Sequence, residues 1–100
     1  MKREEQDSII QQYFKTNYSN YEFDCEREIN PGLNCYYLKD TDTSKQFVLK
    51  ISDCCLEDNS STDITNLINS NIMELMTSSQ GSFVLLKADL TYQVYKINEA

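Results

Sequence analysis

The sequence contains no histidine and has only two glycines in 100 residues. Without histidine, the chain lacks the usual general base, the common partner of a serine or cysteine nucleophile, and the commonest zinc ligand. Two glycines cannot form a phosphate-binding loop, and neither the P-loop pattern nor G-x-G-x-x-G occurs. We therefore expect a protein that is not an enzyme and that binds no cofactor.

Basic residues and long apolar runs are also scarce. The chain has 9 Lys and Arg against 16 Asp and Glu, a net charge of −7. Nucleic acids and anionic membranes are bound through clustered basic residues, so we expect neither as a partner. No apolar run approaches the length of a membrane span, and no apolar segment follows the basic N-terminal residues as in a signal peptide. These features predict a cytoplasmic protein.

Four cysteines could form two disulfides or bind zinc, but the sequence favours neither. Cytoplasmic cysteines are normally reduced, and no C-x₂-C pair occurs among Cys25, Cys35, Cys54 and Cys55. Adjacent residues on a strand point to opposite faces, so Cys54 and Cys55 cannot easily share one tetrahedral ion. We expect free thiols, partly buried, and no metal site.

Residues 40–44, with the sequence DTDTS, partly match two functional motifs. They match the start of an EF-hand loop, but Lys45 and Ile51 stand where the loop needs glycine and glutamate. They also resemble the D-x-D-x-T opening of haloacid-dehalogenase-like phosphatases, a fold that needs a parallel sheet and further lysine and acidic motifs. A hairpin loop stabilised by Asp and Thr side chains is the better interpretation.

Two segments have the apolar period of a helix. Residues 3–15 carry one stripe of Ile9, Ile10, Tyr13 and Phe14, with acidic residues in the first turn. A second period starts at Thr62, with Ser61 or Thr62 as the N-cap, and residues 78–81 are expected to end it. The pattern of residues 53–61 predicts one helical turn followed by a polar loop.

Five segments have the pattern of strands. Residues 21–29 alternate, residues 33–39 and 46–52 follow after short polar connections, and residues 82–88 and 91–97 form a final hairpin with a turn near Asp89. The Asn30-Pro31-Gly32 segment is a turn signal. Residues 83–86 are apolar on both faces, which indicates a central strand or a subunit interface.

These elements predict one small α+β domain over residues 1–100. The expected order is α-β-β-β-α-β-β, with an antiparallel sheet of about five strands and two helices packed on one face. The short connections between the first three strands favour an antiparallel meander.

The first strand alternates between apolar and acidic residues. Its outer face would carry Glu22, Asp24, Glu26 and Glu28 about 6.8 Å apart. Such a row could occupy the basic groove of a nuclease or a nucleic-acid-binding protein. Alternatively, it serves only to prevent aggregation through the strand edge.

Tyrosine, which accounts for seven of the 100 residues, is favoured at protein interfaces and is also an ordinary strand former. We expect some tyrosines, Tyr18, Tyr36, Tyr92 and Tyr95, at strand or loop surfaces. The predicted partner-binding residues are the four carboxylates together with Tyr36, Asp40 and Asp42.

The function favoured by these features is protein binding without catalysis. The first hypothesis is an acidic inhibitor, either an immunity protein against a toxin or a phage-type antagonist of a DNA-processing or nucleic-acid-guided enzyme (an anti-CRISPR protein is one such class). The second rests on element order, because the α-β-β-β-α-β-β order resembles that of the class I type III secretion chaperones. That resemblance implies a homodimer that binds an effector protein.

Overall fold

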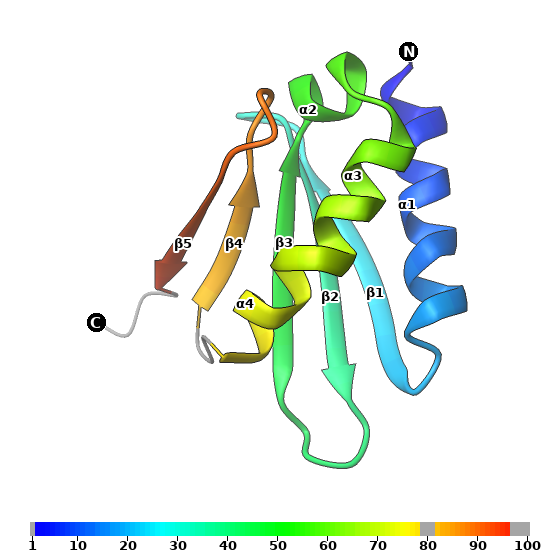
Figure 1. The fold of residues 1–100 in the computed structure, drawn as a ribbon, viewed down its shortest axis with the longest axis vertical. Helices are drawn as coiled ribbons and strands as arrows, with labels where there is room; N and C mark the ends of the chain where they lie inside the picture. Colours follow the sequence, from blue (N-terminus) through cyan, green and yellow to red (C-terminus); the bar gives the residue numbers. More distant parts are fainter. Residues whose placement is uncertain (1, 79–81, 97–100) are drawn as a thin grey trace.

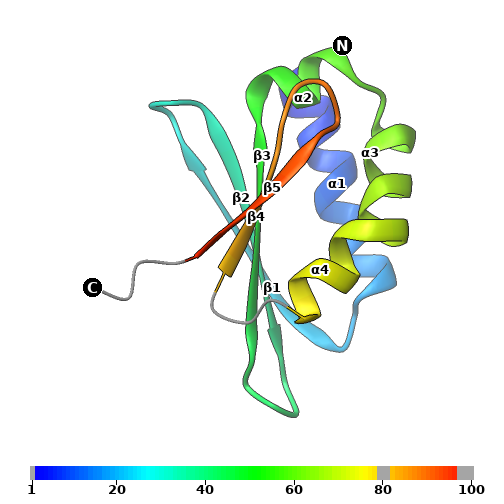
Figure 2. The same ribbon diagram turned by 60° about the vertical axis from the view of Figure 1, so that its left-hand side comes forward.

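The computed structural model describes residues 2–78 and 82–96, which form a five-stranded sheet with helices on one side (Figures 1 and 2). The sheet has the order β1-β2-β3-β4-β5, which follows the sequence. Its strands are β1 (Tyr21–Glu28), β2 (Leu33–Asp40), β3 (Gln46–Ser52), β4 (Ser82–Leu86) and β5 (Tyr92–Lys96). The helices are α1 (Arg3–Asn17), α2 (Asp53–Asp58), α3 (Ser61–Leu67), η1 (Ile68–Ile72) and α4 (Met73–Ser78).

The predicted α+β class, the five strands and the one-sided helices are confirmed, but the sheet is mixed rather than antiparallel. β3 and β4 run parallel, while the other three neighbouring pairs are antiparallel. The cause is the helical connection from α2 to α4. It carries the chain back along the sheet, so that β4 begins at the same end as β3 and runs beside it in the same direction. β4 lies between β3 and β5, so the apolar run at residues 83–86 does form an inner strand.

The predicted second helix begins close to the expected position but is not uniform. Ser60, one residue before the expected caps, accepts a hydrogen bond from the Asp63 amide at 3.1 Å through its Oγ. The helix then passes from α3 through one π-helical turn, η1, into α4. Residues 79–81, expected to end this helix, and residue 97, expected in the last strand, lie outside the described residues. None of the described helices is long and apolar enough to cross a membrane.

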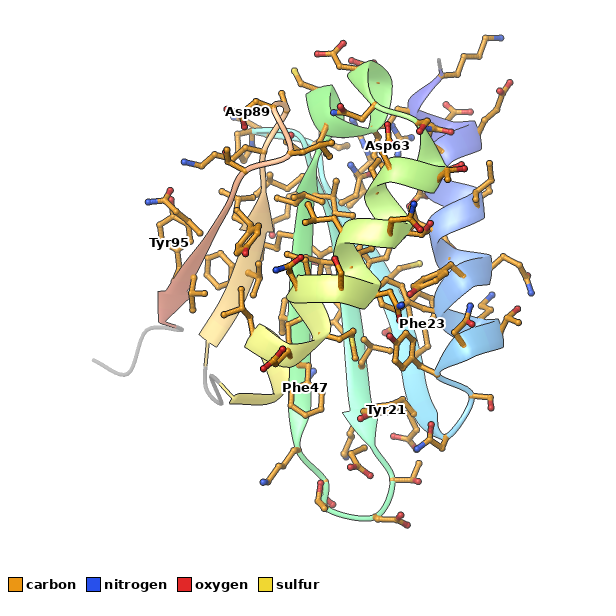
Figure 3. All side chains as sticks on the ribbon, in the orientation of Figure 1. Tyr21, Phe23, Phe47, Asp63, Asp89 and Tyr95 are labelled. Carbon is orange, nitrogen blue, oxygen red and sulfur yellow. The ribbon has the colours of Figure 1, made fainter. Side chains whose placement is uncertain are left out.

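The core lies between the helices and one face of the sheet. Residues from the three inner strands meet residues from α1 and from the α3–α4 segment, and all of them are essentially inaccessible to water: Tyr36, Leu38, Leu49, Ile51, Val84, Leu86, Ile10, Phe14, Ile64, Ile68 and Ile72. Tyr21, Phe23 and Phe47 extend this packing toward the β2–β3 loop (Figure 3). Burial of this apolar surface is the main force that holds the helices on the sheet.

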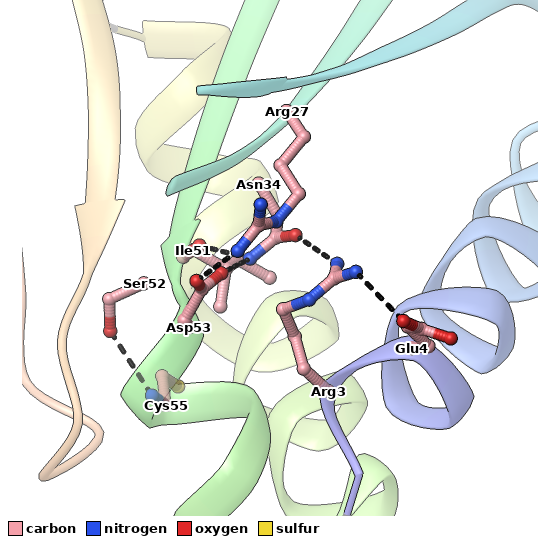
Figure 4. Close-up of polar contacts among 8 residues, drawn as sticks. All are labelled: Arg3, Glu4, Arg27, Asn34, Ile51, Ser52, Asp53 and Cys55. Carbon is pink, nitrogen blue, oxygen red and sulfur yellow. Dashed lines mark hydrogen bonds and ion pairs between the residues drawn. The ribbon is translucent and has the colours of Figure 1, made fainter. Parts of the chain in front are cut away.

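A polar network joins the start of α1, the start of β2 and the start of α2 (Figure 4). Asn34, which is 2% exposed, donates to the carbonyl of Ile51 at 3.0 Å and to Asp53 Oδ1 at 2.8 Å. Its own carbonyl oxygen accepts from Arg3 at 2.8 Å, and Asp53 Oδ2 pairs with Arg27. All the buried polar groups of Asn34 therefore have partners, which offsets the cost of placing an amide in the core.

The turn between β1 and β2 depends on Gly32. Its φ is 96°, and an added Cβ would lie 2.9 Å from Asp53 Oδ2. Its carbonyl accepts a hydrogen bond from the Asp53 amide at 3.0 Å, so the turn also helps to position the polar network. Ile29, the last residue of the predicted strand 21–29, lies in this turn instead and is 80% exposed, because β1 ends at Glu28.

We predict that Gly32→Ala lowers the free energy of unfolding by about 1–3 kcal/mol, because alanine is strained at positive φ and its Cβ crowds Asp53. Urea denaturation measures this change. The control is Ile29→Ala in the same turn, which should change the free energy by less than about 0.5 kcal/mol. Equal stabilities of the wild type and Gly32→Ala would contradict the account of the turn.

Candidate protein-binding surface

The sheet face opposite the helices is uncovered in the described part of the chain (Figure 2). Neighbouring strands place directly paired residues on the same face, so the register identifies the residues of this open face. On β1 they are the four acidic residues, Glu22, Asp24, Glu26 and Glu28. The structure thus places the predicted carboxylates together on one outer face.

Three of the four carboxylates are free to meet a partner. Glu22, Asp24 and Glu26 are exposed, and none of them forms an ion pair with another described residue. Their side chains lie on β1, an edge strand of the sheet. We call these three residues the acidic row.

Glu28 behaves differently, because it is engaged within the domain. Its Oε2 accepts from Lys50 Nζ at 2.9 Å and from Cys35 Sγ at 3.1 Å. The hydrogen bond from Lys50, and then that from Cys35, lower the pKa of the Glu28 carboxyl. Glu28 is therefore compensated internally and contributes less than the other three to an attraction for a basic partner.

An aromatic and apolar line crosses the open face beside the acidic row. The register pairs Asp24 with Tyr37, then Val48, Phe83 and Tyr95 in succession across all five strands. Phe83 and Tyr95 stack with ring centroids 5.3 Å apart, and Lys50 Nζ lies 4.6 Å from the Phe83 centroid. We call Tyr37, Val48, Phe83 and Tyr95 the central line.

A hollow of about 350 Å³ lies where the acidic row meets the central line. Its lining residues come from the first three strands, and they are Glu22, Phe23, Asp24, Tyr37, Lys39 and Gln46. Desolvation, aided by the nearby Cys35 and Glu26, raises the pKa of Tyr37 to about 12, so its hydroxyl remains protonated at neutral pH. The hollow therefore offers a hydroxyl donor next to two carboxylates.

The expected surface position of Tyr36 is wrong. The register puts Tyr36 on the helix face, where it is 0% exposed and donates its hydroxyl to Asp7 Oδ1 at 2.5 Å. Burial is the main cause of a strongly raised pKa for this tyrosine. Tyr36 is a core residue and cannot touch a partner of the folded domain, whereas its neighbour Tyr37 lies on the open face.

Asp40 is the last residue of β2, and Asp42 lies in the loop between β2 and β3, at one end of the sheet (Figure 1). Asp40 Oδ1 accepts from the Asp42 amide at 2.9 Å, so the segment is a hairpin loop held by an Asp side chain, as the sequence predicts. Asp42 is exposed and extends the negative charge beyond the acidic row, while Asp40 is partly buried.

Sequence reasoning missed Tyr37, Lys50 and Phe83 as residues of the candidate surface. The signal was present in the alternation of each strand. Once Tyr36 and Leu49 face the core, Tyr37 and Lys50 must face the other way. Phe83 was recognisable only as part of a strand that is apolar on both faces.

The remaining reactive groups do not converge on a second site. The cysteines are free, and the described residues contain no group of three or more that could hold a metal ion. No family model matches the sequence, and no curated protein or solved structure matches it either. The open face is therefore the feature on which a proposal about function depends.

We predict that the four thiols divide into two pairs. Cys25 and Cys54 are exposed, whereas Cys35 and Cys55 are buried, and burial raises the pKa of each buried thiol to about 11. Iodoacetamide at pH 8 should modify only the exposed pair in the native protein, and all four thiols in urea. Mass spectrometry gives the count. Rapid native labelling of Cys35 would show that the Glu28–Lys50 contact does not shield it.

We predict that the Glu28–Lys50 pair makes stability depend on pH. Because the folded pKa of Glu28 lies below its ordinary value of 4.5, its contribution is complete above that pH and is lost as the pH falls through the lower folded pKa. The stability difference between the wild type and Glu28→Gln should shrink from pH 6 toward pH 3. In a Lys50→Met background, the difference should be small throughout. A pH-independent difference would contradict the ion pair.

Proposed function

We propose that this domain is a non-catalytic inhibitor that binds a basic surface of another protein through its open sheet face. The observation that carries the proposal is the acidic row, Glu22, Asp24 and Glu26, three exposed carboxylates on one edge strand. The class of partner that fits is a nuclease or another nucleic-acid-binding enzyme, because such proteins carry basic grooves. A toxin neutralised by an immunity protein and an enzyme blocked by a phage-type antagonist both belong to this class.

The spacing of the acidic row suits a groove that binds a nucleic-acid backbone. Alternate residues on a strand lie about 6.8 Å apart, so the three carboxylates extend over about 14 Å. This spacing is broadly similar to the separation of successive phosphates along one strand of nucleic acid. Lys and Arg side chains that hold phosphates could therefore pair with the carboxylates, and the bound domain would exclude the substrate.

The central line adds aromatic contact area, which the acidic row does not provide. Exposed ion pairs contribute little to affinity, whereas aromatic residues at the centre of an interface contribute most of it. Tyr37, Phe83 and Tyr95 retain exposed aromatic surface beside the carboxylates. In this proposal, the acidic row guides the encounter and sets the orientation, while the aromatic side chains bury area against the partner.

The second candidate is a dimeric chaperone similar to those of type III secretion. One observation favours it: β5, the other edge of the sheet, carries exposed apolar side chains, Val94 and Tyr95, as a strand at a subunit interface would. A chaperone of this class would bind its effector only as a dimer. The two candidates share protein binding and differ in the chemistry of the partner.

Charge reversal of the acidic row tests the inhibitor proposal. We predict that Glu22→Lys/Asp24→Lys/Glu26→Lys lowers the affinity for the partner captured by the tagged wild-type domain by about 100-fold or more at low salt. Glu28 is left unchanged because its reversal would also break the contact with Lys50. Surface plasmon resonance at two salt concentrations measures the loss and its screening.

The matched control reverses three exposed carboxylates on the helix side, Glu5, Asp58 and Asp63, which gives the same net charge. This variant should retain the wild-type affinity within about threefold if the row itself makes the contact. Equal losses of affinity in both variants would show that net charge, and not the position of the acidic row, causes the loss. Unchanged affinity in the acidic-row variant would show that the acidic row does not contact the partner and would contradict the proposal.

A further inference from the structure

The two edges of the sheet differ in how they are protected from pairing with another strand. β1 carries acidic side chains, which are a common protection of an edge strand. β5 has less of this protection, because its first four residues, Tyr92, Gln93, Val94 and Tyr95, are uncharged and the strand contains no proline. Its one charged residue, Lys96, is the last of the strand. An edge strand with such an uncharged stretch is a template for pairing.

The hydrogen bonds of the β4–β5 hairpin show which main-chain groups of β5 are available. Lys87 donates its amide to the carbonyl of Thr91 at 2.8 Å, so the main chain of Thr91 faces β4. Because main-chain groups on a strand alternate in direction, those of Gln93 and Tyr95 also face β4. The amide and carbonyl of Val94 therefore point outward, where no described strand pairs with them.

Both faces of β5 also keep apolar side chains exposed. Tyr95 is 38% exposed on the open face, and Val94 is 41% exposed on the helix face. Figure 1 shows that α4 lies in front of β3 and β4, and that β5 lies beyond the helices. Figure 3 places Tyr95 at the edge of the sheet farthest from α1. A further strand beside β5 would cover these side chains.

We propose that a second copy of this chain pairs with β5 through its own β5, in antiparallel orientation about a two-fold axis at Val94. In this arrangement, each Val94 exchanges two main-chain hydrogen bonds with Val94 of the partner subunit. Each valine also covers the other where the helices leave it exposed. Gln93 of one subunit stands opposite Tyr95 of the other, which brings no charges together.

Charge explains why the second copy pairs at β5 and not at β1. Pairing two β1 strands would bring the acidic residues of both copies into contact, and like charges on neighbouring strands are destabilising. In the β5 pair, the two β1 strands lie at opposite ends of a ten-stranded sheet, about 40 Å apart. At that distance, salt screens their repulsion, since the Debye length is about 8 Å at physiological ionic strength.

The two-fold axis is perpendicular to the joined sheet, so both open faces lie on the same side. The dimer would thus present two acidic rows to one partner or to two. The inference does not depend on the acidic row, because it uses the opposite edge of the sheet. The two proposals share only Tyr95, which lies on β5 and on the open face. Reversal of Glu22, Asp24 and Glu26 should leave the dimer intact, so the two proposals can fail separately.

Light scattering after size exclusion tests the dimer directly. We expect the wild type to have twice the monomer mass of 11.7 kDa, and Val94→Glu to raise the dissociation constant at least about tenfold by opposing two carboxylates. Val94→Thr keeps a β-branched residue and should remain a dimer. A monomeric wild type at every concentration up to about 1 mM would overturn the proposal.

Proline substitutions in β5 distinguish an effect on dimer formation from an effect on the folding of the domain. The Val94 amide points outward, so Val94→Pro should keep the circular dichroism of the wild type and lose the dimer. The Gln93 amide faces β4, so Gln93→Pro should destabilise the domain itself. A dimer that persists in folded Val94→Pro would overturn pairing at this edge.

Disulfide trapping tests the register. In a background with Cys25→Ser and Cys54→Ser, Val94→Cys places two thiols directly opposite each other, with Cα atoms about 5.5 Å apart. Gln93→Cys places them about 9 Å apart, too far for a disulfide. We expect an oxidised dimer on a non-reducing gel only for Val94→Cys. Trapping of both, of neither, or of Gln93→Cys alone would overturn the arrangement about Val94.

Discussion

Phe14 of α1 packs between Phe23 and Tyr36, with ring centroids 5.7 and 5.8 Å apart, and this contact holds the first helix on the sheet. The α3–α4 segment covers the remainder of the same face. Because all the helices lie on one side, the other face of the sheet stays in contact with solvent in the described chain. The domain therefore needs charged groups on that face to remain folded and dispersed, and β1 supplies them.

This one-sided packing gives the open face two parts with different roles. Glu28 belongs to the domain itself, because it compensates Lys50 and accepts from Cys35. Glu22, Asp24 and Glu26 form no ion pair with the described residues, although Asp24 accepts a hydrogen bond from the Cys25 amide, and their charge is not compensated within the described chain. The aromatic side chains beside them are partly exposed, and in the proposed function a partner covers them.

The sequence predicted the strands more accurately than their directions. Local alternation identifies β3 at Gln46–Ser52 without error, because Phe47, Leu49 and Ile51 need one apolar face. It cannot reveal that β4 returns parallel to β3, since that direction depends on where the helical connection packs. The same limit applies to the site. Alternation placed the carboxylates on one face, but it could not decide between Tyr36 and Tyr37 until the register was known.

The central claim, that the open face is the contact surface, is tested most directly by amide chemical-shift mapping. The ¹⁵N-labelled domain is titrated with the partner captured by the wild type, and the shifts are followed residue by residue. The account predicts that the largest changes fall on Glu22, Asp24 and Glu26 of β1 and around Tyr37 of β2, with small changes on α1 and α3. Large changes confined to the helices, with β1 and β2 unaffected, would contradict it.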